Sequence, residues 1–587
     1  MLMIKIYDAI VIGSGAAAYG VADRLFKENV TDIAVVCENR LGGTSRNTGS
    51  DKQTYYKLSM DGFVNDSPYR MASDIYSAGC CDGEKMYLQA AYSTRCFLRL
   101  CDYGVGFPQD EFGGFPGYKT DHDNTVRATS IGPLTSKVMT EKLENVVLNI
   151  NGTPLFDNRQ VIEVIKNAGR AAGVKVLNTQ TGEFEIFCAK NVVCATGAPA
   201  CIYENSVYPE SQHGMTGVLI EAGVRLCNFS QWQYGMASVD FRWNVSGSFM
   251  QVVPRFVSVD ENGEEREFLA DYFESDAQMC ENIFLKGYQW PFSFARAELS
   301  SKVDIAVHNE TVKGRKVYLD FTRNPKGYCA ENLGAEAYEY LEKNGAFAAT
   351  PFERLKKLNP KAIEVYSRQN IDISKEMLRI AVCAQHNNGG VHTGNNYETD
   401  VAGLYVIGEA AGTFGLARPG GSALNDTQVG GYLCAKHIRE NLGNAAAVSC
   451  ECPENEEIQI DGNVDYSYIK TKMSACAAFL RKKEECEALL EEIKAILCDY
   501  PKKHKSLSNY FYDKDMLISS KALLETILGE MPLTGSRGGA VYTENGVTIA
   551  ENTDYRNYLT ITENGAVSFV KTNPVPRIDE PFEKYIR

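Results

Sequence analysis

Two glycines and an alanine near the start of the chain are spaced to cradle a phosphate group. Gly13, Gly15 and Ala18 match G-x-G-x-x-G/A directly after a short apolar run, which predicts a buried parallel strand. The glycines allow a tight turn and a close approach of the backbone to a pyrophosphate, and Ala18 lets the next helix pack on the strand. That helix, expected over residues 16–27, would turn its free N–H groups toward the phosphate.

A second apolar run ends at Glu38, whose carboxylate can accept hydrogen bonds from an adenosine ribose. The glycines alone would also suit an ordinary strand–helix turn. The order strand, turn, helix, strand and acid favours a dinucleotide site. The next loop is rich in glycine and small hydroxyl residues (Gly43, Thr44, Ser45 and Gly49), so we expect it to close over the cofactor rather than form a surface turn.

One arginine far along the chain has a side chain suited to a substrate anion. Arg418 stands in a glycine-rich loop, where its guanidinium could grip a carboxylate through two parallel hydrogen bonds. A structural ion pair is the alternative role for Arg418, and its position in a glycine-rich loop after a strand favours function.

The composition is that of an ordinary globular enzyme and argues against several partners. The chain has 587 residues, enough for more than one core, of which 44% are hydrophobic and 23% charged. A net charge of -15 argues against nucleic acid or an anionic membrane as the main partner, although a local arginine pocket can still bind an anion. The sequence shows no apolar run of membrane-spanning length and no signal peptide, so we expect a cytoplasmic protein without membrane insertion.

The sequence gives little support for a metal site or a disulfide framework. Its 18 cysteines include no C-x-x-C pair, and reduced, buried thiols are the default in a cytosolic chain. Its 7 histidines show no metal-ligand spacing. We therefore expect no metal.

The sequence pattern changes along the rest of the chain. Residues 104–129 lack periodicity and predict a long irregular loop. The runs VVLNI, VIEVIK, GVKVLN and EFEIFCA predict four strands separated by turns, and they lead into a buried strand that ends at residues 195–197. Residues 466–497 are charged and helix-prone, and a further helix is expected over residues 516–531.

This arrangement resembles the flavoproteins of the fumarate reductase and succinate dehydrogenase superfamily, which includes L-aspartate oxidase. The resemblance rests on eight segments in order: DAIVIGSGAAAYG, LGGTS, NVVCATGAP, GMTGVLIEAGVRL, QHNNGGVHTG, GLYVIGEAAG, ARPGGSALND and LTGSRGGAVY. It implies an α/β fold, namely a Rossmann-like FAD domain of the glutathione-reductase type with an inserted α+β cap domain and a C-terminal helical domain. We expect the FAD domain in residues 1–235 and 376–445, the cap in residues 236–375, and the C-terminal domain in residues 455–587.

The resemblance also implies roles for individual residues. His386 and Arg418 would hold a carboxylate or carbonyl oxygen of the substrate over the flavin, and His386 would add a donor whose charge is adjustable near neutral pH. Arg296 in the cap, with Lys286 as a rival, would donate a proton. The implied FAD contacts are Gly13, Gly15, Ala16, Glu38, Gly43, Thr44, Ser45, Gly49, Ala195, Thr196, Gly197, Glu409, Ser422, Ala423 and Leu424.

An arginine is a poor acid, because its pKa lies far above neutral pH. Arg296 would therefore need a neighbouring carboxylate to relay protons, and Glu298 and Glu310 are the candidates in the sequence. A surface position for Arg296 is an equally good alternative.

The chain departs from the family pattern in two places. Members with covalent FAD carry a histidine just after the glycine pair that corresponds to Gly42 and Gly43. Here residues 44–47 read TSRN, so we expect noncovalent FAD. A histidine that binds a second carboxylate in the fumarate enzymes is replaced by Gly235. This change predicts extra room there, with Trp232 and Tyr234 as possible lining residues, and a substrate with one acidic or carbonyl end.

Three functions remain open at this stage. The first is reduction of an activated C=C bond in a small unsaturated carboxylate or enone, and the second is the reverse direction, as in an oxidase or dehydrogenase of an amino or organic acid. The third is a flavin-binding subunit without chemistry of its own. The electron donor of a reductase would be a flavoprotein, a ferredoxin or reduced nicotinamide, and the sequence does not decide among them.

Overall fold

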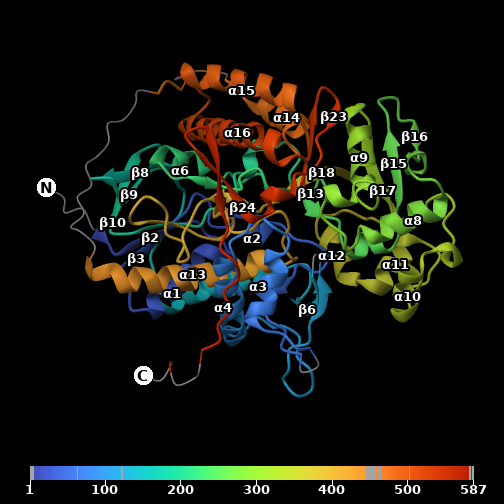
Figure 1. Cartoon of the computed structure of the whole chain (residues 1–587), viewed down its shortest axis with the longest axis horizontal. Coiled ribbons are helices and arrows are strands. Elements are labelled where there is room, and N and C mark those ends of the chain that lie inside the picture. Colours follow the sequence, from blue (N-terminus) through green and yellow to red (C-terminus); the bar gives the residue numbers. More distant parts are fainter. Residues whose placement is uncertain are drawn as a thin grey trace.

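The structure of the chain is a computed structural model, and it describes residues 6–61, 64–120, 123–444, 458–460, 462, 464–501, 503–580 and 584. The expected end of the FAD domain at residue 445 and the expected start of the C-terminal domain at residue 455 lie outside the described residues. Figure 1 shows the nucleotide-binding sheet on one side of the molecule, the cap on the other, and the C-terminal helices above the nucleotide-binding side and the centre.

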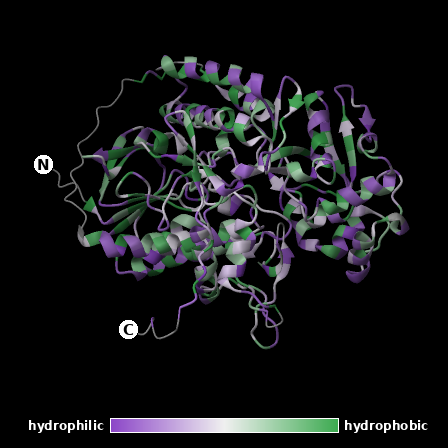
Figure 2. Ribbon diagram, viewed as in Figure 1, coloured by the Kyte–Doolittle hydropathy of each residue, from purple (hydrophilic) through white to green (hydrophobic). Residues whose placement is uncertain are grey.

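A parallel five-stranded sheet of order β20-β11-β2-β3-β7 carries the nucleotide site. Its strands are β2 (Ala9–Ile12), β3 (Ile33–Val36), β7 (Leu155–Phe156), β11 (Val192–Cys194) and β20 (Leu404–Val406). Four of these five strands are fully buried, as expected for a parallel sheet covered on both faces, and Figure 2 shows its strands largely in green. Because all strands run the same way, the segments that follow them meet at one edge of the sheet.

Two helices, α1 (Ala16–Lys27) and α13 (Ser422–Asn441), pack against each other beside this sheet (Figure 1). The helix expected over residues 16–27 is thus confirmed. Small residues on α1 make the close packing possible, since a Cβ at Gly20 would come within 2.9 Å of the Gln428 amide of α13. The first turns of both helices therefore point at the same edge of the sheet.

A second sheet of order β1-β10-β9-β8 confirms three of the four strands expected before residue 195. They are β8 (Arg159–Asn167), β9 (Arg170–Asn178) and β10 (Phe184–Ala189), which form an antiparallel meander. The fourth expected strand is wrong, because VVLNI forms a π-helical turn (Val146–Ile150) that continues helix α5 (Thr135–Asn145). Burial of Val146 and Val147 against the core outweighs their β-branched preference for strands.

The irregular loop expected over residues 104–129 is also partly wrong. It ends in a hairpin of β5 (Tyr118–Thr120) and β6 (Asp123–Thr129), and β6 pairs with β4 (Tyr55–Tyr56). A buried ion pair holds this hairpin, with Arg127 Nη2 lying 2.7 Å from Asp66 Oδ1. Such a long-range pair leaves no local periodicity in the sequence.

The cap is built on a six-stranded sheet of order β14-β13-β18-β17-β15-β16 and has its own hydrophobic core. Its strands are β13 (Trp232–Ser238), β14 (Trp243–Asn244), β15 (Arg255–Val259), β16 (Glu265–Arg266), β17 (Lys316–Asp320) and β18 (Leu378–Asn387). Strands β15 and β16 form a hairpin around residues 260–263. The expected boundary between residues 235 and 236 falls inside β13, so this strand belongs to the sheet of the cap along its whole length.

The C-terminal part contains three helices, α14 (Ser467–Cys476), α15 (Lys483–Cys498) and α16 (Leu507–Thr534). The single stretch expected over residues 466–497 is split by the short strand β21 (Leu480–Lys482), and the helix expected over residues 516–531 lies within the longer α16. The helical description is incomplete, because this part also contributes strands. Among them, β24 (Tyr558–Glu563) pairs with β12 (Leu226–Cys227) of the preceding part of the chain.

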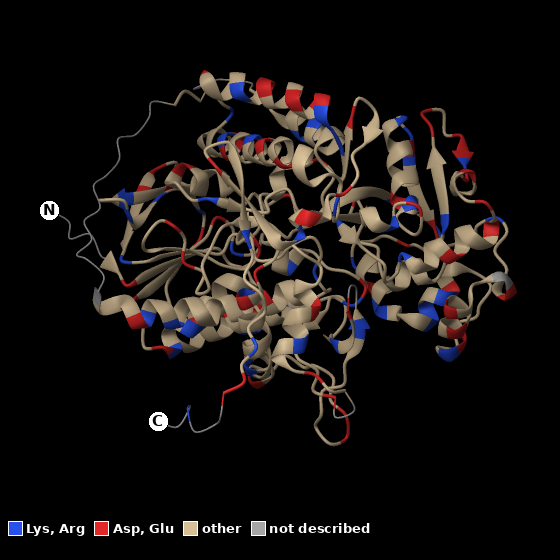
Figure 3. Cartoon of the chain, in the orientation of Figure 1, with Lys and Arg blue, Asp and Glu red and all other residues tan. Residues whose placement is uncertain are grey.

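Charges of both signs are interspersed along the outer helices. On α15, Figure 3 shows glutamates in the majority with a few lysines among them. None of the helices within the described residues combines the length and the hydrophobicity that crossing a membrane requires.

Candidate active site

A cavity of about 760 Å³ lies where the nucleotide sheet, the cap and helix α16 meet. It reaches from the glycine loop after β2 and Glu38 after β3 to the cap residues 244–251 and 284–290. Every site residue expected from the sequence lines this cavity, except Ser422 and Arg296. The glycine-rich segment around Gly13 and the one around Arg418 therefore contribute to the wall of the same cavity.

The loop after β2 has the shape of a phosphate cradle. Gly13 has a φ of +119°, and a Cβ there would lie 2.6 Å from the carbonyl oxygen of Ala195 after β11. Only glycine fits this position, because the angle and the contact both exclude a side chain. Gly15 then precedes α1, and the N–H of Ala16 donates to Ser45 Oγ at 3.1 Å. Gly15, Ala16 and Ala17 line the cavity at the start of α1, a position suited to the pyrophosphate of a dinucleotide.

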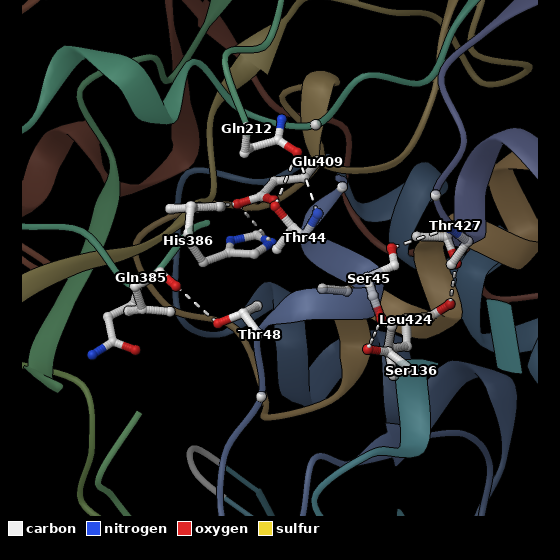
Figure 4. A pocket seen from close by; sticks show the side chains of 18 of the residues that line it. Thr44, Ser45, Thr48, Ser136, Gln212, Gln385, His386, Glu409, Leu424 and Thr427 are labelled. Carbon is white, nitrogen blue, oxygen red and sulfur yellow. Dashed lines mark hydrogen bonds and ion pairs between the residues drawn. The ribbon is translucent and has the colours of Figure 1, made fainter. Parts of the chain in front are cut away.

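The second glycine-rich loop is joined to the end of β11 by a glutamine. Figure 4 shows Gln212 beside Thr44, whose Oγ1 donates to Gln212 Oε1 at 3.0 Å. The other end of the amide donates to the carbonyl oxygen of Thr196 at 2.6 Å. A Cβ at Gly49 would lie 2.5 Å from the ring of Trp243, so close packing against the cap sheet requires glycine there. The loop is therefore fixed on both sides.

The N-terminus of helix α13 also borders the cavity. Ala423 and Leu424 line the cavity, as expected. Ser422 does not, because it is buried and its Oγ donates to the carbonyl oxygen of Pro419 at 2.8 Å. It shapes the turn before α13 instead of contacting the cavity.

His386 and Glu409 lie at the end of the cavity next to the cap sheet, with their side chains pointing toward each other (Figure 4). His386 Nε2 is 3.8 Å from Glu409 Oε1, and the same oxygen accepts hydrogen bonds from the N–H of Asn387 at 3.0 Å and from the hydroxyl of Tyr208. Arg418 lines the same cavity, and its guanidinium carbon lies 6.0 Å from the ring centre of Phe414.

Burial sets the protonation states of this group. It lowers the pKa of His386 well below the usual value, and the positive charge of Arg418 adds to this effect. Burial also raises the pKa of Glu409 to about 7. The expectation that His386 changes charge near neutral pH is therefore wrong for the ligand-free site, and Glu409 is the group that titrates there.

A neighbouring amide determines which nitrogen of His386 carries the proton. Asn388 Nδ2 donates to the carbonyl oxygen of Gly415 at 2.9 Å, so Asn388 Oδ1 faces His386 Nδ1 at 3.1 Å. A neutral imidazole donates to this oxygen through Nδ1 and keeps a lone pair on Nε2. His386 therefore turns an acceptor toward Glu409, whose carboxyl group can carry the proton.

The residues expected to donate a proton from the cap do not reach the cavity. Arg296, in a short helical turn (Phe294–Arg296), does not line it. Lys286 is fully buried and lies 2.8 Å from Asp304. Of the two relay candidates, Glu298 pairs with Lys302 at 3.1 Å and Glu310 accepts a hydrogen bond from Ser258 at 2.6 Å, and neither lines the cavity.

The extra room expected beside Gly235 is filled. A Cβ at Gly235 would lie only 2.1 Å from Nε1 of Trp290, which lines the cavity from the cap. The glycine is therefore needed to admit an indole ring, and the pocket gains a bulky neutral group in place of a charged one. Trp232 and Tyr234 are core residues that do not line the cavity.

Several lining residues were not identified from the sequence. They are Tyr208, Gln212, His213, Gln385, Tyr288, Trp290, Glu336 and Tyr512. Most stand in loops or short turns with no repeated pattern, and Tyr512 comes from a helix near the other end of the chain. The segment GMTGVLIEAGVRL was the nearest available signal, since Gln212 and His213 directly precede it.

Comparisons with known proteins agree with this geometry. The family described as FAD binding domain matches residues 8–424. L-aspartate oxidase of Yersinia pestis is 25% identical over 486 residues, which cover 78% of this chain and 79% of that protein. An uncharacterized FAD-dependent oxidoreductase of Methanocaldococcus jannaschii is 21% identical over 557 residues, covering 89% of this chain and 91% of that protein.

Solved structures share the whole fold. FrdA of E. coli quinol fumarate reductase matches with a TM-score of 0.72 at 18% identity, over 99% of this chain and 98% of that chain. Mycobacterium smegmatis Sdh1 in complex with UQ1 matches with a TM-score of 0.72 at 18% identity, over 98% of this chain and 95% of that chain. The expected fold class and the expected resemblance are thus confirmed. The chain belongs to the FAD binding domain family, and it is an FAD-dependent oxidoreductase with FAD as its cofactor.

Proposed function

We propose that this protein reduces an activated C=C bond in a small unsaturated carboxylate or enone. The observation that carries the proposal is the placement of Arg418 and His386 on the wall of the cavity that also contains the phosphate cradle of Gly13 and Gly15. When bound, FAD supplies the hydride. The side chains of the cavity then have to bind the substrate, polarise it and deliver a proton.

Arg418 is proposed to bind the carboxylate or carbonyl oxygen of the substrate. A guanidinium withdraws electron density from the bound group and stabilises negative charge that develops on it, which activates the adjacent C=C bond. A bound anion would also offset the repulsion between Arg418 and a protonated His386. The proton held by Glu409 could then move to His386 Nε2, hydrogen-bond to the substrate oxygen while negative charge develops there, and return to Glu409 when the carbon is protonated.

The one proton that the reaction consumes, which is added to carbon, is proposed to come from Tyr288. This tyrosine lines the cavity from the cap and is hydrogen-bonded to Glu336, which lines it too, and burial together with Glu336 raises its pKa. A tyrosine hydroxyl can protonate a strongly basic carbon, and Glu336 can return the proton. Tyr288 thereby replaces Arg296, which does not reach the cavity.

Neutral groups surround the position where fumarate enzymes would have a second charged donor. Gln385 Nε2 donates to the carbonyl oxygen of Gly235 at 2.8 Å, and Asn244 Nδ2 donates to Gln385 Oε1 at 2.8 Å. Trp290 covers Gly235 itself. A second carboxylate would be poorly compensated here after leaving water, which favours a substrate with a single acidic or carbonyl end.

The alternative is an FAD-dependent oxidase or dehydrogenase of an amino or organic acid. The similarity to L-aspartate oxidase of Yersinia pestis favours it, and the same Arg418 could bind the carboxylate of an amino acid. A flavin-binding subunit without chemistry is disfavoured, because it would not need Arg418 and His386 beside the cofactor cradle.

One experiment separates these functions. The flavin is photoreduced without oxygen and mixed with unsaturated acids and enones, and the oxidised protein is mixed with L-aspartate and other amino acids. Reoxidation by an unsaturated compound supports the reductase, whereas bleaching by an amino acid supports the oxidase. The physiological electron donor, which we expect to be a flavoprotein, a ferredoxin or reduced nicotinamide, is tested by adding each to the oxidised protein.

A further inference from the structure

A tyrosine of helix α16 lines the cavity beside Glu38. The hydroxyl of Tyr512, on α16, donates to Glu38 Oε1. His213 Nδ1 lies 3.4 Å from the same oxygen, and the rings of His213 and Tyr512 stack with centres 3.8 Å apart and planes 19° apart. All three residues line the cavity. The carboxylate of Glu38, which follows β3, is thus held by Tyr512, a residue 474 positions further along the chain.

The position of Tyr512 is set by packing that does not involve Glu38. Asp515 Oδ1 accepts a hydrogen bond from the N–H of Val218 at 2.9 Å, and Lys514 Nζ lies 2.7 Å from Glu221 Oε1. These contacts fix α16 on α6 (Thr216–Ala222). The hydroxyl of Tyr512 is therefore held in place before any ligand arrives.

We propose that Tyr512 is part of the FAD site and positions Glu38 for the adenosine ribose. One carboxylate oxygen of Glu38 is held by Tyr512, so the other stays directed for a ribose hydroxyl and loses little freedom on binding. The stacked rings of His213 and Tyr512 close this end of the cavity. FAD affinity then depends on the C-terminal part of the chain, whichever substrate the enzyme uses.

The test is the affinity of the flavin-stripped full-length protein for FAD, FMN and ADP, measured by fluorescence and competition. Tyr512→Phe removes only the hydroxyl and is expected to weaken FAD and ADP about tenfold, as for a lost hydrogen bond to a charged group. FMN lacks the adenosine and should bind as it does to the wild type. Tyr510→Phe, in the same helix but outside the cavity, is the matched control and should leave FAD affinity unchanged.

A purely structural role for Tyr512 predicts a different result. The melting temperature of the flavin-free variant would fall, and FAD, FMN and ADP would weaken together. That pattern, an equal effect of Tyr510→Phe, or a Tyr512→Phe protein that binds FAD as tightly as the wild type would overturn the proposal. The expected pattern is an unchanged flavin-free melting temperature and a smaller stabilisation on adding FAD.

Discussion

His386 and Glu409 face each other across 3.8 Å, measured from Nε2 to Oε1, at the end of the cavity where Arg418 also lies. The histidine is neutral because burial and Arg418 lower its pKa, and the glutamate titrates near neutrality because burial raises its pKa to about 7. One proton can therefore be stored in this pair without a net charge on the imidazole. Two of the predictions below depend on these residues.

Replacing Arg418 should abolish turnover and leave the cofactor in place. Arg418→Ala removes the charged contact to the substrate and the stabilisation of its developing negative charge, so kcat/KM should fall on the order of a thousandfold or more. The flavin spectrum and the FAD content of the purified variant should match the wild type. Arg242→Ala, an arginine outside the cavity, is a suitable control. Activity of Arg418→Ala within about tenfold of wild type would remove Arg418 from the substrate site.

The activity should decline on the alkaline side of neutrality. Glu409 has a pKa of about 7, so the fraction that holds the stored proton falls as pH rises through that value. We expect kcat/KM of the wild type to decrease about tenfold per pH unit well above this pKa. Glu409→Gln cannot titrate and should show a lower rate without this alkaline limb. An unchanged limb in the variant would show that another group is responsible.

Removal of the Tyr288 hydroxyl should slow the protonation step. Tyr288→Phe is expected to lower kcat by about a hundredfold or more, which is the usual contribution of a positioned acid, with little change in KM. Tyr340→Phe is the matched control, since Tyr340 lines the same cavity and donates to Gln251 Oε1 at 3.1 Å. Equal effects of the two substitutions would point to cavity shape, and a normal kcat in Tyr288→Phe would exclude it as the donor.

FAD should be bound without a covalent link. The stretch Thr44–Asn47 contains no histidine at the position that carries the link in covalent relatives, and the loop is instead held by Thr44 and Gln212. Acid precipitation should release a yellow supernatant with the mass of FAD. A flavin that stays with the denatured protein would contradict this prediction.

Most residues that the sequence assigned to the cofactor line one cavity, and their signals in the sequence are local. Gly13 and Gly15 are required by backbone angles and close contacts within a strand–turn–helix unit, and Glu38 follows the next strand. Arg418 and Glu409 were identified by short motifs in the same way. Such motifs do not depend on contacts with distant parts of the chain, so they can be identified from the sequence alone.

The substrate half was harder to predict, because it depends on contacts between distant segments. Gly235 suggested an open space, yet Trp290 from a separate loop fills it. Arg296 matched a family position by its surroundings in sequence, but it does not line the cavity. The π-helical turn at residues 146–150 is a similar case. Burial against the core determined the conformation of a segment whose residues favour a strand.

The most direct test of the proposed function is reoxidation of the anaerobically reduced flavin by defined unsaturated compounds. Monocarboxylic enoates or cyclic enones should restore the oxidised spectrum, form the saturated product in equal amount, and exceed fumarate in kcat/KM by about tenfold or more. Fumarate as the better substrate would contradict the single-carboxylate pocket around Gly235 and Trp290. If none of these compounds reoxidises the flavin, while L-aspartate or another amino acid bleaches the oxidised protein, the reductase proposal is wrong.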